Sequence, residues 1–461
     1  MTYQTDLSTL LNRQKAFFHA GHTRTYAFRS QMLQRLQQAI IEEEQAITSA
    51  LAEDFGKPAF ETYATEMAIL LAEIRFTRKH LKNWMAPRRV PSSFLNYPSK
   101  DFIYPEPYGV ALIIGAWNYP FQLTLAPVIG AIAAGCCAIL KPSELTPATS
   151  AVTAKLLRTY FPDDYLTVVE GGADTSQQLL HLPFDKIFFT GSVPVGKVVA
   201  QAAAQQLIPV TLELGGKSPC LVDETADLKV TARRIAWGKF INAGQTCVAP
   251  DYLLVHKSIE QPLLEELKTA LTHFYGTSPK QSPDYARIVN DRHFQRLSQL
   301  LLGGTVFAGG ETDADERYIA PTLLTNVSWQ DAVMQEEIFG PLLPVLTYNT
   351  LSEAVQQVNA QPKPLALYFF SRDKKAQEQV LAQTSSGGAC INETVSHLAN
   401  PHLPFGGVGP SGQGNYHGKY SFDAFSHQKS VLKKPFWPDL PLRYPPYLKK
   451  LGWMKKVFKW I

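Results

Sequence analysis

Short apolar runs separated by long stretches constrain the fold of this chain more than any other feature of its sequence. Five runs rich in β-branched or aromatic residues lie at least 16 residues apart, at positions 110–116, 137–140, 166–169, 186–189 and 210–214. Strands joined by connections of that length run parallel, because the chain must cross over the sheet between them. The spacing therefore predicts βαβ units and a parallel sheet.

A second series of such runs follows the first. Its six candidate strands cover residues 220–222, 252–255, 322–324, 342–347, 365–370 and 389–392, and helical patterns fill the gaps between them. At 461 residues the chain is too long for one hydrophobic core. We therefore expect two α/β domains, with a boundary near Gly215 and Gly216.

The N-terminal part differs in texture from the rest. Leu33, Leu36 and Ile40 recur at helical spacing, so the first 84 residues are predicted to form amphipathic helices. Five prolines between Pro87 and Pro107 then interrupt the pattern. Such a segment is typical of a connecting arm.

Composition excludes several classes of protein. With 45% apolar and 18% charged residues, the chain is expected to be globular and not intrinsically disordered. Its five cysteines show no paired spacing and no Cys/His cluster, which predicts reduced thiols, a cytoplasmic setting and no metal site. The first eleven residues lack the apolar core of a secretory signal.

Positive charge is concentrated at the C-terminus. Residues 431–461 hold eight basic side chains and one acidic one, whereas the preceding 430 residues hold 36 basic and 39 acidic side chains. The body of the protein is therefore not expected to bind nucleic acid.

The tail also carries an apolar pattern. In a helix, one stripe would be formed by Tyr447, Leu451, Met454, Phe458 and Ile461, with lysines around it. This arrangement favours a helix that lies in a membrane interface. Packing of the stripe on the protein itself or on a second copy is the alternative.

Two glycine-rich segments match nucleotide-binding motifs in part. Residues 407–412 fit GxGxxG, but no strand precedes them and Pro410 disfavours a following helix, so we expect a tight glycine loop. Residues 191–198 follow a strand and open a helix, yet Val198 stands where a triphosphate-binding loop has the Ser or Thr that holds magnesium. This helix start suits a dinucleotide diphosphate without a metal; an ordinary strand-to-helix turn is the alternative.

Three polar residues are candidates for chemistry. Cys247 lies in a polar, glycine-bearing loop where substrate can reach a thiol, whereas the other four cysteines lie in or beside apolar strands. Glu213 ends a predicted strand, where α/β proteins place ligand-facing groups; a solvated strand end is the alternative. Asn118 follows the first strand and is either a site residue or a helix N-cap.

Together these segments resemble the aldehyde dehydrogenase superfamily, and within it the class 3 branch that acts on fatty and aromatic aldehydes. The resemblance covers about residues 105 to 430. It rests on eight motifs in the expected order: PYGV at 107–110, GAWNYP at 115–120, KPSE at 141–144, FTGS at 189–192, ELGGKSP at 213–219, GQTCVAPDY at 244–252, EIFGP at 337–341 and PFGG at 404–407. The short N-terminal lead, the run CVAPDY and the run SFDAFSH at 421–427 are the class 3 features.

The resemblance implies NAD(P)-dependent oxidation of medium- or long-chain or aromatic aldehydes to carboxylic acids. Cys247 would attack the carbonyl as a thiolate of lowered pKa and form a thiohemiacetal and then a thioester. Asn118 and the backbone N–H of Cys247 would bind the oxyanion. Glu213 would activate the hydrolytic water.

The resemblance also assigns residues to the cofactor, NAD or NADP. These are Gly191, Ser192 and Gly196 for the diphosphate, Lys141 and Glu144 for the adenine-side ribose, Glu337 for the nicotinamide ribose, Phe339 for the ring region, and Trp117 as a further cofactor-binding residue. A carboxylate binds the ribose hydroxyls of NAD, whereas a lysine can pair with the 2′-phosphate of NADP. The presence of both leaves the choice of cofactor open.

The implied fold class is α/β, with a Rossmann-type parallel-sheet cofactor domain, an α/β catalytic domain and a small bridging arm. In chain order the expected parts are a helical N-terminal part of the cofactor domain (1–85), a bridging arm (86–104), a dinucleotide-binding domain (105–214), a catalytic domain (215–420), a bridging strand (421–434) and a basic amphipathic tail (435–461). We expect a cytoplasmic homodimer that associates with a membrane surface through residues 447–461.

Other functions would use only part of these residues. A cofactor-independent thiol esterase needs Cys247 and Glu213 but neither the motif at 141–144 nor the one at 191–192. A catalytically idle membrane scaffold would not need Cys247, Glu213 and Asn118. A Cys-His protease would need a histidine in a comparable motif, and none is seen.

Overall fold

The computed structural model describes residues 6–439 and 441–459. By its internal contacts the chain forms two units. Unit 1 combines Met1–Trp84 with Pro107–Ser426, and unit 2 combines Met85–Glu106 with His427–Ile461. Each unit is therefore built from two segments that are distant in the sequence.

The first sheet of unit 1 contains the five strands predicted between residues 110 and 214. They are β3 (Val110–Ile114), β4 (Cys137–Lys141), β5 (Leu166–Val168), β6 (Lys186–Thr190) and β7 (Val210–Glu213), in the order β7-β6-β3-β4-β5. All five run parallel, and the short β17 (Gly412–Gln413) adds an antiparallel edge beside β7. The predicted βαβ units are confirmed.

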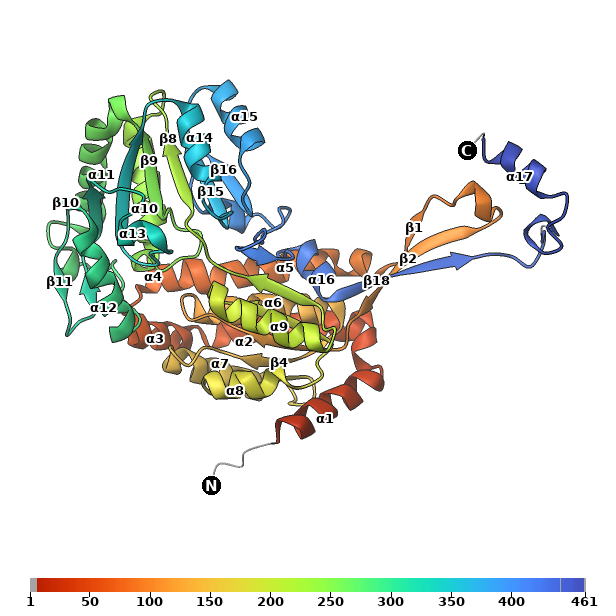
Figure 1. The fold of residues 1–461 in the computed structure, drawn as a ribbon. Helices are drawn as coiled ribbons and strands as arrows, with labels where there is room; N and C mark the ends of the chain where they lie inside the picture. Colours follow the sequence, from red (N-terminus) through yellow and green to blue (C-terminus); the bar gives the residue numbers. More distant parts are fainter. Residues whose placement is uncertain (1–5, 440, 460–461) are drawn as a thin grey trace. The chain divides into compact units, whose positions relative to one another are not determined.

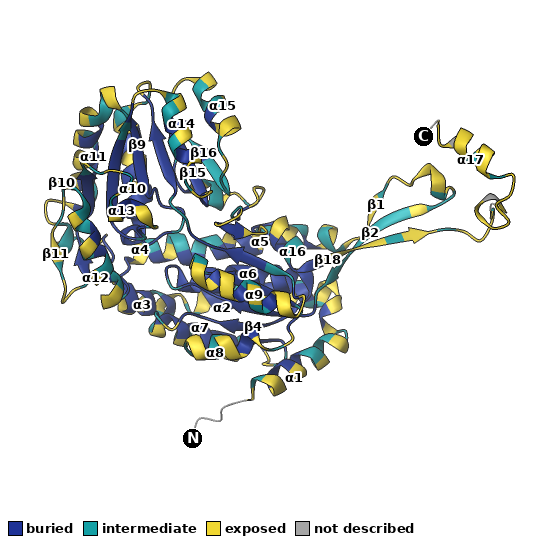
Figure 2. Ribbon diagram, viewed as in Figure 1, coloured by how far each residue is buried: buried dark blue, intermediate teal, exposed yellow. Residues whose placement is uncertain are grey.

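Helices cover this sheet. α6 (Pro120–Ala134), α7 (Pro147–Tyr160) and α9 (Val193–Gln205) pack on its strands. Every residue of α6 is buried, since the helix contacts β3 and β4 and also α2 (Tyr26–Glu42) and α16 (Lys419–Ala424) (Figure 2). This explains why α6 is apolar all round.

The predicted N-terminal helices are present. They are α1 (Leu7–His19), α2, α3 (Glu44–Phe55), α4 (Ala59–Thr62), a π-helical turn (Tyr63–Met67) and α5 (Ala68–Met85). Leu33, Leu36 and Ile40 are fully buried, as their helical spacing predicts.

The second sheet of unit 1 contains the second series of predicted strands (Figure 1). Its order is β10 (Thr305–Ala308), β13 (Thr322–Thr325), β14 (Leu342–Tyr348), β9 (Tyr252–His256), β8 (Pro219–Val222), β15 (Ala366–Phe370) and β16 (Gly388–Ile391). All pairs are parallel except that of the edge strand β10 with β13. The α/β fold class is therefore confirmed for both halves of unit 1.

Six helices accompany the second sheet. They are α10 (Leu228–Phe240), α11 (Glu260–Tyr275), α12 (Asp291–Leu300), α13 (Ala332–Gln335), α14 (Leu351–Asn359) and α15 (Lys374–Gln383). A two-stranded ribbon of β11 (Thr312–Asp313) and β12 (Tyr318–Ile319) lies between α12 and β13 in the sequence.

Unit 2 is a three-stranded sheet with a tail. β1 (Arg88–Val90), β2 (Lys100–Pro107) and β18 (Ser426–Lys433) pair in that order, and residues 421–424 of the expected bridging strand lie instead in α16. Most of β18 is exposed. An ion pair joins Lys429 to Glu106, and the Lys433 ammonium lies 5.2 Å from the centre of the Phe102 ring.

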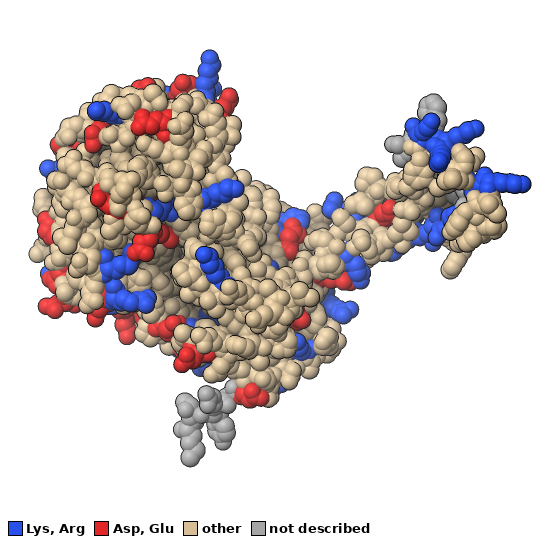
Figure 3. All heavy atoms as spheres, in the orientation of Figure 1, with Lys and Arg blue, Asp and Glu red and all other residues tan. Residues whose placement is uncertain are grey.

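The tail contains one short helix, α17 (Leu451–Val457). Tyr447, Leu451 and Phe458 of the predicted stripe are exposed, whereas Ile461 lies outside the described residues. Lysine and arginine side chains gather on the tail (Figure 3). No helix within residues 6–439 and 441–459 is long and apolar enough to cross a membrane.

The segment 407–412 forms a tight glycine loop, as predicted. Gly409 and Gly412 have φ values of 63° and 155°, which favour glycine, and a β-bridge joins them. The next helix starts only at Lys419. The GxGxxG match is therefore not a dinucleotide fingerprint.

Asp54, near the end of α3, caps the first turn of α7 although it belongs to another helix. Its buried carboxylate accepts hydrogen bonds from the backbone N–H groups of Ala148 (3.2 Å) and Thr149 (2.8 Å) and from the Thr149 hydroxyl (2.7 Å). We expect Asp54→Ala to lower the free energy of unfolding by about 1 to 3 kcal/mol, because buried donors lose a charged acceptor. Denaturant unfolding measures the change. The exposed neighbour Glu53→Ala is the control, and equal stability of the two variants would contradict the capping role.

Candidate functional site

The predicted site residues collect at the carboxyl ends of the first sheet. Trp117 and Asn118 follow β3, Gly191 follows β6 and Glu213 ends β7. Because β4 and β6 lie on opposite sides of β3, the strand order reverses there. Such a switch point is where open α/β sheets bind ligands.

The loop that carries Cys247 has an unusual backbone. It follows α10 and contains Asn242, Ala243 and Gly244 with φ values of 53°, 50° and 74°. Left-handed conformation costs a non-glycine residue about 1 to 2 kcal/mol. A Cβ on Gly244 would collide with the backbone carbonyl of Gly340, so this position requires glycine. The surrounding contacts must hold the other two residues in place.

A hydrogen-bond network holds this loop against Asn118. The Asn118 amide donates to the Gln245 carbonyl (3.1 Å), and the Asn242 amide donates to the Asn118 carbonyl (2.8 Å). The Gln245 amide donates to the carbonyls of Asn242 and Arg287, both at 3.0 Å. Asn118 and Cys247, far apart in the sequence, are therefore parts of one rigid cluster.

The Cys247 thiol is only partly exposed and lies near two carboxyl groups. Burial, followed by the charges of Glu337 and Glu213, raises its pKa to about 12, although N–H groups of Cys247 and Val248 act in the opposite direction. The lowered pKa expected from the sequence is thus not produced by the protein groups around the thiol. Burial and two acidic side chains expected at the site, Glu213 and Glu337, act against ionisation of the thiol.

Glu213 is a buried carboxyl group whose oxygens lack hydrogen-bond partners among the described residues. Its side chain is 3% exposed, and neither oxygen has a hydrogen-bond partner among the described residues. Burial raises its pKa well above the usual value. An uncompensated acid of this kind beside a thiol is typical of a proton-transfer group.

The turn between β6 and α9 fits a diphosphate. The Gly191 N–H donates to the Glu213 carbonyl (3.0 Å), and Ser192 is the N-cap of α9. Among the described residues, the Ser192 side chain makes no capping hydrogen bond and the buried Thr190 hydroxyl has no partner. Free N–H groups at a helix start and unpaired hydroxyls suit phosphate oxygens.

Gly196 lies on the inner face of α9. A Cβ there would collide with the side chain of Leu214, which follows β7. The glycine therefore allows α9 to approach the sheet closely, and it does not lie at the helix end with Gly191 and Ser192. Close helix packing is one of the roles of glycine in dinucleotide-binding turns.

Lys141 and Glu144 form an ion pair at the end of β4. The ammonium and carboxylate groups are 2.5 Å apart, with the lysine side chain 3% exposed and the glutamate side chain 44% exposed. Partial burial acts to raise the pKa of Glu144, but the hydrogen bond and charge of Lys141, together with a backbone N–H, lower it overall. Lysine and carboxylate thus stand side by side where the ribose is expected.

Glu337, Phe339 and Trp117 are the remaining residues expected to bind the cofactor. Burial, followed by the charge of Asp251, raises the pKa of Glu337 to about 8, whereas the Gly216 N–H lowers it. The Trp117 ring lies 5.1 Å from the Phe339 ring and 5.0 Å from that of His293. His293 was not predicted, since a lone histidine in a helix carries no local signal.

An apolar cavity of about 520 Å³ reaches Cys247. Its lining is mainly aliphatic and aromatic, and includes Phe60, Ile69, Leu123, Trp237, Val248 and Phe405. Phe60 and Trp237 are also exposed to solvent, so they mark a mouth of the cavity. The cavity leads an apolar molecule from the surface to the thiol.

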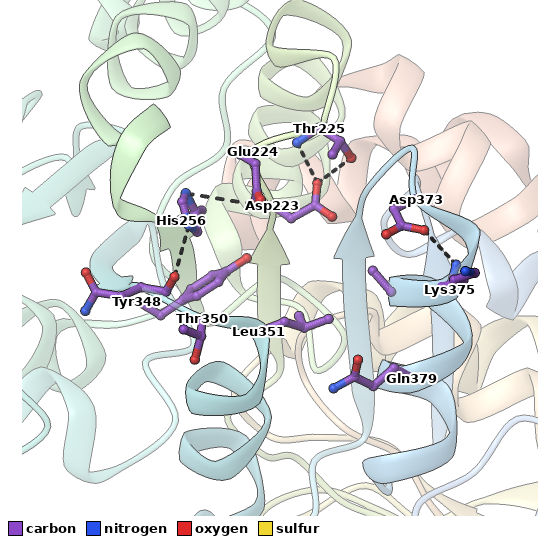
Figure 4. Close-up of a pocket in the computed structure, with 12 residues that line it drawn as sticks. Asp223, Glu224, Thr225, His256, Tyr348, Thr350, Leu351, Asp373, Lys375 and Gln379 are labelled. Carbon is purple, nitrogen blue, oxygen red and sulfur yellow. Dashed lines mark hydrogen bonds and ion pairs between the residues drawn. The ribbon is translucent and has the colours of Figure 1, made fainter.

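A second cavity, of about 230 Å³, lies at the carboxyl ends of β8, β9, β14 and β15 (Figure 4). Its acidic residues serve local structure: Asp223 binds the N–H and hydroxyl of Thr225, and Asp373 caps α15. Among the described residues, no group of three His, Cys, Asp or Glu side chains could hold a metal ion. This cavity therefore remains a polar cleft without an assigned ligand.

The chain is similar in sequence to known proteins over nearly its whole length. The family model described as "Aldehyde dehydrogenase family" matches residues 3–431. A 4,4'-diaponeurosporen-aldehyde dehydrogenase of Staphylococcus aureus is 52% identical over 447 residues, which cover 96% of this chain and 97% of the relative. A rat (Rattus norvegicus) enzyme named "aldehyde dehydrogenase, dimeric NADP-preferring" is 48% identical, with 95% of this chain and 98% of the relative covered.

A solved structure described as the substrate-bound state of Staphylococcus aureus AldH superposes with a TM-score of 0.97. It is 50% identical in sequence, and the match covers 99% of this chain and 100% of that one. These matches support NAD(P)-dependent oxidation of aldehydes as the activity of this chain. This chain belongs to the aldehyde dehydrogenase family and has family 3 members among its relatives, as its motifs predict.

Proposed function

We propose that Cys247, Glu213 and Asn118 oxidise an apolar aldehyde in this enzyme. The observation that carries the proposal is the apolar cavity that ends at the thiol. The volume of about 520 Å³ admits an extended hydrocarbon or aromatic body, and the open mouth at Phe60 and Trp237 lets a longer chain protrude. The Staphylococcus aureus relative is named for a diaponeurosporenal, which supports a long apolar substrate.

Cys247 acts as the nucleophile. Its sulfur attacks the aldehyde carbon, and the thiol proton must leave because a thiol with a pKa of about 12 is a weak nucleophile. That proton passes to water, which leaves Glu213, whose oxygens have no partner among the described residues, for the later hydrolysis of the thioester. Sulfur then forms a bond to the carbonyl carbon.

Asn118 stabilises the oxygen that becomes negative. Its side-chain nitrogen carries two N–H groups, and one of them is committed to the Gln245 carbonyl. The other N–H and the backbone N–H of Cys247 bind the oxyanion. Donors held in place beforehand are worth about 100- to 1000-fold in rate for each donor.

NAD or NADP, when bound, supplies the hydride acceptor. Gly191 and Ser192 hold the diphosphate, Gly196 brings α9 close, and Trp117, Phe339 and Glu337 line the crevice beside the thiol. The Lys141–Glu144 pair faces the adenine-side ribose, where the pair can accept hydroxyls or a 2′-phosphate. Glu213 then removes a proton from the water that hydrolyses the thioester.

A thiol esterase activity would need only Cys247 and Glu213. It is the second candidate because a buried acid beside a thiol also hydrolyses activated esters. The crevice at β6 and α9 has no purpose in that reaction. We therefore place it as a side activity of the dehydrogenase.

Unit 2 is the oligomerisation arm in this proposal. Most of β18 is exposed and most of β2 is only half-buried, so this three-stranded sheet gains stability when a second copy covers it. A dimer is supported by the rat relative, which is named dimeric. Residues 1–85 and 105–214 then form the cofactor domain, and residues 215–420 the catalytic domain.

The tail attaches the enzyme to a membrane surface in the cytoplasm. Tyr447, Leu451, Trp453 and Phe458 are exposed beside five lysines, and none of these side chains is needed for the core of unit 2. Lysines near an anionic membrane contribute about 1 kcal/mol each. An enzyme held there takes apolar aldehydes directly from the lipid.

Cys247→Ala is expected to reduce aldehyde oxidation to below about 1% while the dissociation constant for NAD(P) stays within about threefold, because the nucleophile is lost and the crevice remains. Steady-state assay with a chain-length series of aldehydes and titration of tryptophan fluorescence measure the two quantities. Cys390→Ala, outside the proposed site, is the control. Activity of Cys247→Ala above a few per cent would remove the thiol from its role.

Glu213→Gln is expected to keep a burst of NAD(P)H and to lower steady-state turnover by about 100-fold or more, because deacylation loses its base. The raised pKa means that Glu213 becomes ionised only as the pH rises, so wild-type deacylation should increase with pH. The variant should lose that increase. Loss of the burst itself would show that Glu213 mainly activates the thiol.

Removal of the tail is expected to abolish membrane binding. Full-length protein should float with vesicles that contain phosphatidylglycerol and remain soluble with neutral vesicles, whereas a chain that ends at Pro445 should remain soluble with both. If both proteins stay in the soluble fraction, the membrane proposal fails and the apolar stripe packs on the protein itself or on a second copy.

A further inference from the structure

Glu61 connects the wall of the apolar cavity with the loop that carries the nucleophile. It lies in α4, lines the cavity near Phe60, and accepts a hydrogen bond from the backbone N–H of Asn242 at 3.0 Å. The two residues are 181 positions apart in the sequence. One side chain therefore belongs both to the substrate-binding wall and to the support of the strained loop.

Asn242 is the residue through which the loop is aligned. Its amide group donates to the carbonyls of Asn118 (2.8 Å) and Gln245 (3.2 Å), and Asn118 donates to the same Gln245 carbonyl. Its own φ of 53° is unfavourable for a side-chain-bearing residue. A shift of Asn242 would displace the oxyanion donor of Asn118 and the backbone N–H groups near Cys247 together.

No neighbour other than Asn242 gives the Glu61 carboxylate a hydrogen bond or an ion pair among the described contacts. Burial raises its pKa to about 7; the charge of Lys57 and the Asn242 N–H lower it, and Asp284 raises it. Lys57 is already paired with Glu66 at 2.7 Å, with both side chains fully buried. Glu61 is half-buried in a mainly apolar wall, and its carboxylate accepts there the hydrogen bond of the Asn242 N–H.

We infer that Glu61 is a positioning residue that aligns the Asn118 and Cys247 groups by holding the Asn242 N–H. The inference rests on the proposed roles of Cys247 and Asn118. It predicts that the hydrogen-bond acceptor at position 61 matters and that its negative charge does not. Acylation of the thiol depends on this contact, whereas cofactor binding does not.

The test compares Glu61→Gln, which keeps an acceptor oxygen, with Glu61→Met, which has a similar length and no acceptor. We expect Glu61→Met to lower kcat and the burst rate at least tenfold, with KM for the aldehyde not increased. Glu61→Gln should stay within about twofold of wild type. Glu53→Met, an exposed substitution of the same kind in α3, is the control.

A second measurement needs neither aldehyde nor cofactor. The rate at which iodoacetamide alkylates Cys247 reports the position and reactivity of the thiol. We expect this rate to change at least threefold in Glu61→Met and to remain as in wild type in Glu61→Gln. Should Glu61→Met fail to fold, Glu61→Ala replaces it. This readout separates the inference from the proposed function, because it remains valid for a wild-type protein that does not oxidise aldehydes.

Two results would overturn the inference. One is wild-type kcat and alkylation in Glu61→Met, which would show that the loop holds without the contact. The other is equal impairment of Glu61→Gln and Glu61→Met, which would show that the charge at position 61 is what matters.

Discussion

Parallel pairing in unit 1 determines where chemistry can take place. Helices bury the first sheet, as the fully buried α6 shows, so ligands reach polar groups at the strand ends. The chain leaves the carboxyl end of β7 at Glu213 and enters the amino end of β8 at Pro219 after five residues. Cys247 precedes β9, which pairs with β8. The carboxyl edge of one sheet and the amino edge of the next therefore supply the two halves of one site.

The ionisable groups around the thiol all have raised pKa values. Burial, followed by the charges of Glu337 and Glu213, raises the pKa of the thiol, and burial raises the pKa of each acid. Three groups in one site thus favour their neutral forms. A thiol kept protonated reacts slowly with stray electrophiles.

Much of this arrangement could be predicted from the sequence, and the remainder shows what local patterns omit. Strand positions were predicted because apolar runs and their spacing are local signals, and the motifs around Asn118, Glu213 and Cys247 marked the site. The contacts of Glu61 and Asn118 with Asn242 span 181 and 124 residues and leave no local trace. The raised pKa of the thiol was missed for the same reason, since its burial, the main cause, and the approach of Glu337 arise only in the folded chain.

The division of unit 2 between distant segments has a consequence for synthesis on the ribosome. β2 ends at Pro107, but its partner β18 begins only at Ser426, near the end of the chain. At 5 to 20 residues per second, the β1–β2 hairpin waits roughly 20 to 60 seconds for the strand that completes its sheet. An isolated hairpin is marginally stable in water, so through that interval its edge is open to chaperones and to other nascent chains. The edge of β2 must stay unpaired while most of unit 1 is being made. Charged residues and proline in this strand, among them Lys100, Asp101 and Pro105, disfavour pairing with other chains during that time.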